Sequence, residues 1–198
     1  MVRVSQSKSA KVVGVLALQG AYQSHAKVLD TLDVGSQEVR TPQDLASIDA
    51  LVMPGGESTT MSQLLESSEL FEPINKLIHE GMPVFGTCAG MILLAKKIID
   101  GRADQVSFAA IDIEVQRNAY GRQVDSFEAD LEIEIFDDSF HALFIRAPRI
   151  VKADQTVETL AELNGDIVLA KQKNVLVASF HPELSPDSRI HELFIKEI

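Results

Sequence analysis

A repeated order of apolar run, glycine-containing loop and helical pattern most constrains the fold of this chain. The first run covers residues 12–18 and ends at Gln19-Gly20, and apolar residues then recur at helical spacing over residues 22–32. Short apolar runs of this kind are typical of strands buried on both faces, as in parallel sheets that helices cover. The order therefore predicts βαβ units around a parallel sheet.

The same order recurs twice before residue 101. The predicted strands cover residues 50–53 and 83–85, and the predicted helices begin near Ser58, a candidate cap, and cover residues 69–79 and 91–99. Right-handed crossovers place the carboxyl ends of parallel strands along one edge. The loops at Gln19-Gly20, Gly55-Gly56 and residues 86–90 are therefore expected to meet at the edge where open α/β sheets bind ligands.

The pattern changes after Gly101. Residues 111–115 and 131–135 alternate between apolar and acidic side chains, which is typical of antiparallel strands with one wet face. Further strands are expected over residues 141–145, 166–171 and 174–180, and a last helix near 187–197. The sequence thus indicates an α/β fold with a mostly parallel sheet and some antiparallel strands.

Charge and length limit the classes of partner. The 198 residues carry a formal charge of −11, from 18 basic and 29 acidic side chains. That balance argues against a nucleic acid or an anionic membrane as partner, and no stretch approaches the ~20 apolar residues of a membrane span. We expect residues 1–10 to form a polar tail and residues 11–198 to form a single domain. Without an apolar leader segment, the cytoplasm is the expected location.

The single cysteine stands where a nucleophile would. Cys88 lies in the pattern Gly86-x-Cys88-x-Gly90 between a predicted strand and a predicted helix, which is the spacing of a nucleophile elbow with cysteine in place of serine. Helix N–H groups beside the sulfur favour a thiolate and can bind a developing oxyanion. The alternative is that Cys88 is a small core residue, because free cysteines are often buried.

A histidine follows another buried run. His181 comes directly after it and precedes Pro182-Glu183. If Pro182 keeps this segment extended, His181 and Glu183 point the same way and the carboxylate can orient the imidazole. The alternative is an ordinary strand end. Of the other histidines, His141 opens a predicted strand, and the rest lie in helical patterns as expected surface or boundary residues, namely His25, His79 and His191.

The Gly55-Gly56 loop is the third candidate element. Two glycines allow a close approach of the backbone to a ligand, and a peptide N–H here could bind an oxyanion. The spacing of a phosphate-binding loop is absent. An ordinary β–α turn is the alternative.

These elements, in this order, resemble the class I, or triad-type, glutamine amidotransferases. Within that class the sequence is similar to the glutaminase subunits of pyridoxal 5′-phosphate synthases. The resemblance is carried by residues 14–21, 54–60, 85–90, 117–128, 144–148 and 180–184. It implies a three-layer α/β sandwich around the central sheet.

The resemblance also implies roles for individual residues. Cys88, His181 and Glu183 would be the catalytic triad that hydrolyses L-glutamine through a glutamyl thioester. The positions matching oxyanion-stabilising and glutamine-binding sites are Gly55, Gly56, Glu57, Ser58, Ala89, Arg117, Ile145 and Arg146. Arginines suit the α-carboxylate of the substrate, although Arg117 and Arg146 could instead form structural ion pairs.

Members of this family deliver ammonia to a synthase subunit, so the resemblance implies a hetero-oligomeric partner. It implies neither a metal nor a cofactor, since pyridoxal 5′-phosphate is the product of the complex. We expect the Gln19-Gly20 end of the first strand to face the partner. Two other classes stay open: a cysteine peptidase or chaperone-like hydrolase with a similar elbow, and a binding module with a degenerate site.

Overall fold

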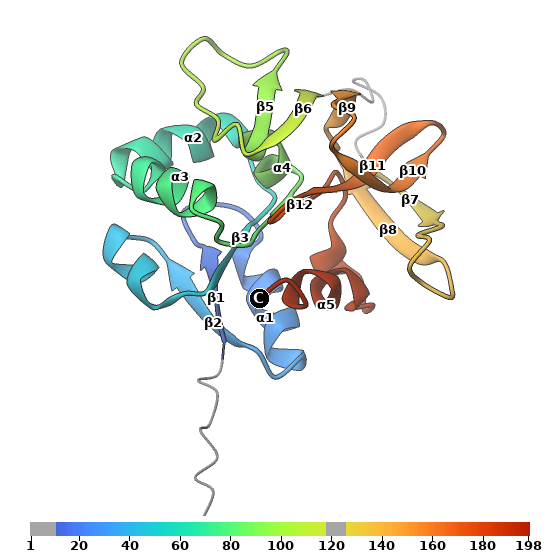
Figure 1. The fold of residues 1–198 in the computed structure, drawn as a ribbon, viewed down its shortest axis with the longest axis horizontal. Helices are drawn as coiled ribbons and strands as arrows, with labels where there is room; N and C mark the ends of the chain where they lie inside the picture. Colours follow the sequence, from blue (N-terminus) through green and yellow to red (C-terminus); the bar gives the residue numbers. More distant parts are fainter. Residues whose placement is uncertain (1–10, 118–125) are drawn as a thin grey trace, which may run out of the picture.

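A seven-stranded sheet forms the centre of the molecule (Figure 1). The computed structural model describes residues 11–117 and 126–198. The parallel strands, in spatial order, are β2 (Gly35–Val39), β1 (Val12–Leu16), β3 (Ala50–Met53), β4 (Val84–Thr87) and β12 (Val175–Ala178). β11 (Asp166–Gln172) and β10 (Glu158–Leu163) extend the sheet in antiparallel fashion. The predicted mostly parallel sheet with antiparallel strands is confirmed.

Two apolar clusters, one on each face of the sheet, make the fold three-layered. Along β3, Leu51 and Met53 belong to one cluster and Ala50 and Val52 to the other, because alternate side chains of a strand point to opposite faces. The first cluster packs against α2 (Ser58–Ser67), α3 (Phe71–His79) and α4 (Ala89–Leu94), and the second against α1 (Tyr22–Thr31) and α5 (Arg189–Ile195). Figure 1 shows α2 and α3 on one side of the sheet and α1 and α5 on the other.

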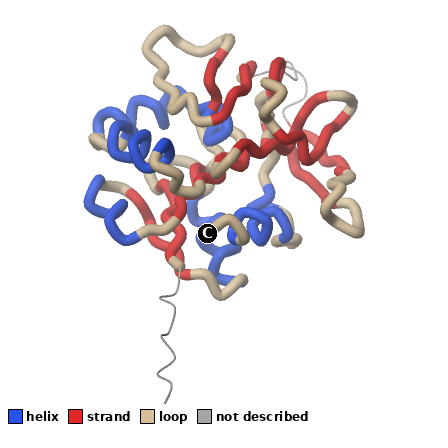
Figure 2. The backbone as a smooth tube through the Cα atoms, in the orientation of Figure 1, coloured by secondary structure: helices blue, strands red, loops and turns tan. Residues whose placement is uncertain are grey.

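The second half of the chain adds two small sheets. β5 (Ala95–Ile98), β6 (Ile111–Gln116) and β9 (Arg149–Ala153) form one, and β7 (Ser126–Leu131) pairs with β8 (Phe140–Ile145) in the other. Two 3-10 turns, η1 (Pro42–Ser47) and η2 (Pro182–Leu184), complete the elements. Figure 2 shows most helices around the parallel strands and a strand-rich region beyond them, as the change of pattern after Gly101 predicts.

The helix expected over residues 91–99 is wrong in its second half. α4 ends at Leu94, and β5 begins at Ala95, whose backbone is extended. The carbonyls of Leu93 and Leu94 accept hydrogen bonds from Phe108 and Ala110, which pair the chain with a neighbouring segment in place of a further helical turn. An apolar run alone does not separate a helix from a buried strand.

The strand expected over residues 131–135 is also wrong. β7 ends at Leu131, and the Phe136 N–H donates to the Ile133 carbonyl in a turn. The alternation of burial persists only as far as Glu134: Ile133 packs in the core and Glu132 and Glu134 face solvent, but Ile135 is exposed as well. The strands β2, β7, β9 and β10 were not predicted. β2 is largely polar, the other three mix polar and apolar residues, and β2, β9 and β10 lie at sheet edges.

Some expectations lie outside the described residues. These are the tail at residues 1–10 and the part of the family motif at residues 118–125. Among residues 11–117 and 126–198, no helix has the length and apolar character that crossing a bilayer requires.

Candidate active site

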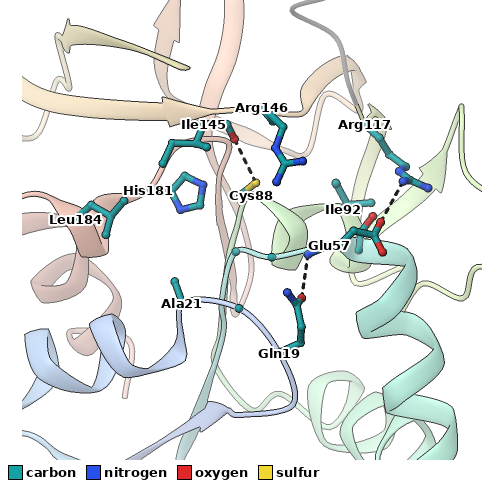
Figure 3. Close-up of a pocket in the computed structure, with 14 residues that line it drawn as sticks. Gln19, Ala21, Glu57, Cys88, Ile92, Arg117, Ile145, Arg146, His181 and Leu184 are labelled. Atoms are coloured by element: carbon teal, nitrogen blue, oxygen red, sulfur yellow. Dashed lines mark hydrogen bonds and ion pairs between the residues drawn. The ribbon is translucent and has the colours of Figure 1, made fainter. Parts of the chain in front are cut away.

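A pocket of about 320 Å³ opens at the carboxyl ends of the central parallel strands (Figure 3). It brings together the three glycine-containing loops, as the topology predicts. Its lining residues are Gln19, Gly20, Ala21, Gly55, Gly56, Glu57, Ser58, Cys88, Ile92, Arg117, Ile145, Arg146, His181 and Leu184. Cys88 and His181 lie at one end of the pocket in Figure 3, with Glu57 and Arg117 at the other.

Cys88 occupies a strained turn between β4 and α4. Its φ is +48° and its ψ is −103°, which few non-glycine residues adopt. The turn is tight: a Cβ atom on Gly90 would come within 2.1 Å of the Met53 carbonyl oxygen, and one on Gly86 within 2.7 Å of the Gly90 carbonyl carbon. These contacts explain why small residues flank the cysteine, and the predicted nucleophile elbow is confirmed as a geometry.

Backbone contacts hold the cysteine in place. The Cys88 N–H donates to the Ala178 carbonyl of β12 at 2.8 Å. The thiol makes a long contact of 3.9 Å with the Ile145 carbonyl oxygen. The sulfur therefore lies where the ends of β4, β12 and β8 converge.

His181 and Glu183 form a buried pair beside Cys88. His181 Nδ1 lies 2.7 Å from Glu183 Oε1, and both residues are almost entirely buried. The predicted pairing is confirmed, but the expected extended backbone is wrong. Pro182–Leu184 is a 3-10 turn, for which the fixed φ of Pro182 is equally suitable at the first position.

The electrostatics of this pair favour a protonated imidazole. Burial by itself would lower the pKa of His181, but hydrogen bonds and the charges of Cys88 and Glu183 raise that pKa to about 10. Burial would likewise raise the pKa of the Glu183 carboxyl, yet His25 and His181 hold it below its usual value. A carboxylate facing an imidazolium is the arrangement that a cysteine–histidine pair needs for nucleophilic attack.

Glu57 links the glycine loop to the other end of the pocket. Its carboxylate caps α2 by accepting hydrogen bonds from the Thr59 and Thr60 N–H groups at 3.1 and 2.6 Å. The cap is therefore Glu57, and the expectation that Ser58 caps this helix is wrong, because Ser58 is already its first residue. Glu57 also pairs with Arg117 at 3.3 Å.

Arg117 is held by several groups. Its guanidinium donates to Thr59 Oγ1 at 2.8 Å and to Gln105 Oε1 at 2.9 Å, besides its contact with Glu57. The structural ion pair that was one alternative for Arg117 is therefore present. Arg117 nevertheless lines the pocket, as does Arg146, whose φ is +42°.

Most of the predicted site residues meet at this pocket, but two lie behind its surface. Glu183 is buried behind His181, and Ala89 is buried at the start of α4. The pocket also contains residues that the sequence analysis did not assign to it: Gln19, Gly20, Ala21, Ile92 and Leu184. The loop Gln19-Gly20 was expected at this edge from its place after the first strand, but none of its residues was named as a catalytic or substrate-binding position.

Gln19 has a structural part in the site. Its Oε1 accepts a hydrogen bond from the Glu57 N–H at 2.9 Å. The Ala21 N–H donates to the Gly55 carbonyl at 3.1 Å. The loop after β1 thus fixes the glycine loop after β3.

Two histidines were wrongly predicted to lie at the surface or its boundary. His25 and His191 are both fully buried, and His25 approaches the Glu183 carboxylate. The helical spacing correctly predicted that both histidines lie in helices, but it did not predict what those helix faces pack against. Within the described residues, no cluster of His, Cys, Asp or Glu is arranged to hold a metal ion.

Comparisons with known proteins agree with this geometry. Residues 15–198 match the SNO glutamine amidotransferase family. A relative from Thermosipho africanus described as pyridoxal 5′-phosphate synthase subunit PdxT is 50% identical over 94% of this chain and 98% of its own length. A protein of the same description from Herpetosiphon aurantiacus is 52% identical over 92% of this chain and 98% of its own.

A solved structure is similar over the whole fold. It is described as a crystal structure of glutamine amidotransferase, is 45% identical in sequence and superposes with a TM-score of 0.88. The similarity covers 93% of this chain and 97% of the solved one.

Proposed function

The chain belongs to the SNO glutamine amidotransferase family, and from this premise we propose that it hydrolyses L-glutamine to L-glutamate and ammonia. The proposal depends on one observation above all. A cysteine on a strained turn faces a buried His181–Glu183 pair at the end of a pocket that also holds two arginines. The relatives described as pyridoxal 5′-phosphate synthase subunits support the further proposal that the ammonia serves that synthesis.

Acylation is the first half of the proposed reaction. The Cys88 thiol gives its proton to His181, and the sulfur attacks the side-chain carbonyl carbon of glutamine. The C=O electron pair moves to the oxygen, and on its return the C–N bond breaks. His181 donates its proton to the departing nitrogen, so ammonia leaves and a γ-glutamyl thioester remains on Cys88.

Hydrolysis of the thioester completes the cycle. His181 accepts a proton from water, whose oxygen attacks the thioester carbonyl. The C–S bond then breaks to release glutamate, and the departing Cys88 sulfur takes the proton back from His181. Glu183 keeps the imidazole oriented in both halves, because it accepts the hydrogen bond from Nδ1 and leaves Nε2 for the reacting atoms.

Backbone groups near Cys88 are the proposed oxyanion donors. Ala89 begins α4, so its N–H has no partner within the helix. A Cβ atom on Gly55 would come within 2.5 Å of the His181 ring, so the glycine lets this loop approach the triad. The Gly55 carbonyl accepts a hydrogen bond from the Ala21 N–H. The Gly56 N–H belongs to the same trans peptide and therefore points in the opposite direction, away from Ala21. These features support Ala89 and Gly56 as donors.

The rest of the pocket suits the amino-acid end of glutamine. Arg117 and Arg146 offer guanidinium groups for the α-carboxylate, and Glu57 offers a carboxylate for the α-ammonium. Ser58 and Ile145 complete the proposed binding positions. We assign the synthase subunit as partner, with ammonia passing to it before it can be protonated in water.

Ammonia release tests the proposal. The chain and its Cys88→Ala variant are each assayed with glutamine, alone and with the synthase subunit. We expect release by the wild type in the presence of the synthase subunit, and a loss of at least about a thousandfold in the variant, since the nucleophile is removed. A wild type that releases no ammonia even with that partner would rule out the proposed function.

A further inference from the structure

A second pair of histidines lies behind the triad, in the interior between α1, β4 and α5. His25 belongs to α1 and His191 to α5, and both are fully buried. His25 Nδ1 lies 2.9 Å from His191 Nε2, and His25 Nε2 lies 3.1 Å from Thr87 Oγ1. The same Nε2 lies 3.4 Å from Glu183 Oε2. His25 therefore connects the triad carboxylate with His191.

The two oxygens of Glu183 face different histidines. Oε1 accepts the hydrogen bond from His181, while Oε2 is buried and has no hydrogen bond of ordinary geometry within the described residues. A buried carboxylate oxygen that lacks a donor is costly. The His25 N–H, which Thr87 Oγ1 and Glu183 Oε2 can share, is the donor that the fold brings toward it.

The contacts favour one placement of the protons. If His25 carries its proton on Nε2, it donates toward Glu183, and its Nδ1 accepts from the Nε2–H of His191. This leaves only a lone pair without a partner, on His191 Nδ1. In the reverse placement His25 carries its proton on Nδ1, so the lone pair of its Nε2 faces the Glu183 carboxylate. His191 then carries its proton on Nδ1, where it has no acceptor. Buried N–H groups without an acceptor are rarer than buried acceptors without a donor.

The surroundings keep both rings neutral. The titratable groups that face His25 are Glu183, His181 and His191, and Phe85 packs edge-on against both rings of the pair. Burial lowers the pKa of His25, with Glu183 opposing and His181 assisting. Burial and the neighbouring His25 lower the pKa of His191 to about 3. A neutral ring has a single N–H, so the direction of its donation matters.

We propose that His25, with its tautomer fixed by His191, is a positioning residue that holds the second oxygen of Glu183 and so orients His181 toward Cys88. The inference rests on the proposed function and deepens it. Four buried side chains then form one polarised row, running from His191 through His25 and Glu183 to His181. Each histidine donates a hydrogen bond toward Glu183: His191 to His25, His25 to Glu183 Oε2, and His181 to Glu183 Oε1.

Alkylation of Cys88 by iodoacetamide tests this in the full chain without a glutaminase assay. His25→Leu removes the donor, whereas His25→Gln keeps an amide N–H close to the position of Nε2. In His25→Leu we expect the rate at about pH 6 to fall by about tenfold and the rate at about pH 9 to stay within about twofold, because the imidazolium that supports the thiolate is less favoured. In His25→Gln both rates should remain within about threefold of the wild type.

The same variants are then assayed for glutamine hydrolysis with the synthase subunit. We expect kcat to fall by about ten- to a hundredfold in His25→Leu, with KM changed by less than about threefold, and most of kcat to return in His25→Gln. Thermal unfolding of both variants separates a loss of fold from a loss of orientation. Identical pH profiles of alkylation for wild type and a folded His25→Leu would overturn the proposal.

A measurement on the unmodified chain covers the case in which His25→Leu does not fold. Nitrogen-15 NMR of the histidine side chains reports which nitrogen carries each proton. We expect Nε2–H on His25 and on His191, and a proton on Nδ1 of His181. A proton on Nδ1 of His25 contradicts the inference. If the wild type fails to hydrolyse glutamine but shows these tautomers and profiles, the proposed function fails and the positioning role stands.

Discussion

At the scale of single residues, Glu57 serves two elements with one carboxylate. It caps α2 through Thr59 and Thr60 and pairs with Arg117 across the pocket. Burial would raise its pKa, but hydrogen bonds from Thr60 and Thr59 lower it from 4.5 to about 2. The helix that borders the pocket therefore begins at a group that also belongs to the proposed substrate site.

This pKa predicts how Glu57→Gln changes stability with pH. The folded pKa lies below the unfolded value of 4.5, so the carboxylate stabilises the fold fully above pH 4.5 and loses this effect as pH falls through about 2. The side chain is partly exposed, so we expect a loss of about 1 kcal/mol at neutral pH, typical of a helix cap, and almost none near pH 2. Urea unfolding at several pH values measures the difference between the two proteins.

The exposed Glu66, on the same helix, provides the control. Glu66→Gln should change the free energy of unfolding by less than about 0.5 kcal/mol. A loss in Glu57→Gln that is the same at pH 2 and pH 7 would contradict the assigned role of the carboxylate.

The proximity of the proposed triad residues was predictable, whereas the histidines behind them were not. Cys88 and His181 each follow a buried strand, and strand ends of a parallel sheet meet at one edge, so their proximity follows from topology. His25 and His191 lie on two helices that are far apart in sequence. Their contact depends on how α1 and α5 pack against β4, and no local pattern encodes that packing.

At the scale of elements, the turn between β4 and α4 depends on close contact with β3. A Cβ on Gly90 would come within 2.1 Å of the Met53 carbonyl oxygen, and a backbone atom cannot move aside as a flexible side chain does. The position of Cys88, the proposed nucleophile, therefore depends on a glycine two residues away from it. The apolar run beyond it could equally have been a strand, and it is in fact divided between α4 and β5.

Gly90→Ala tests this close approach. We expect it to lower the free energy of unfolding by more than about 2 kcal/mol, because overpacking outweighs the better helix propensity of alanine. Gly35→Ala is the matched control, since its nearest contact would be an ordinary 3.4 Å from the Lys11 carbonyl oxygen. The control should change stability by less than about 1 kcal/mol. Equal effects of the two substitutions in thermal unfolding would show that the steric argument is wrong.

At the scale of the whole molecule, the charge and the exposed apolar residues are distributed differently. On one of the small sheets the charges are paired, Asp112 with Lys96 and Glu114 with Lys97. Leu184 and Ile145, in contrast, are exposed apolar residues at the mouth of the pocket. A group of this kind beside a reactive centre is typical of a surface that another protein covers.

Leu184→Glu tests whether this mouth contacts the proposed synthase subunit. Leu184 keeps 44% of its surface exposed, so a charge there should leave the fold intact but should weaken association, because a contact that becomes buried would enclose a carboxylate. We expect the dissociation constant, measured by sedimentation with the synthase subunit, to rise by at least about tenfold. Ile135→Glu is the matched control, with 54% exposure in the turn after β7 and no place in the pocket lining. If the control weakens association as much as Leu184→Glu does, the effect comes from added negative charge on an acidic protein and the mouth is not the docking surface.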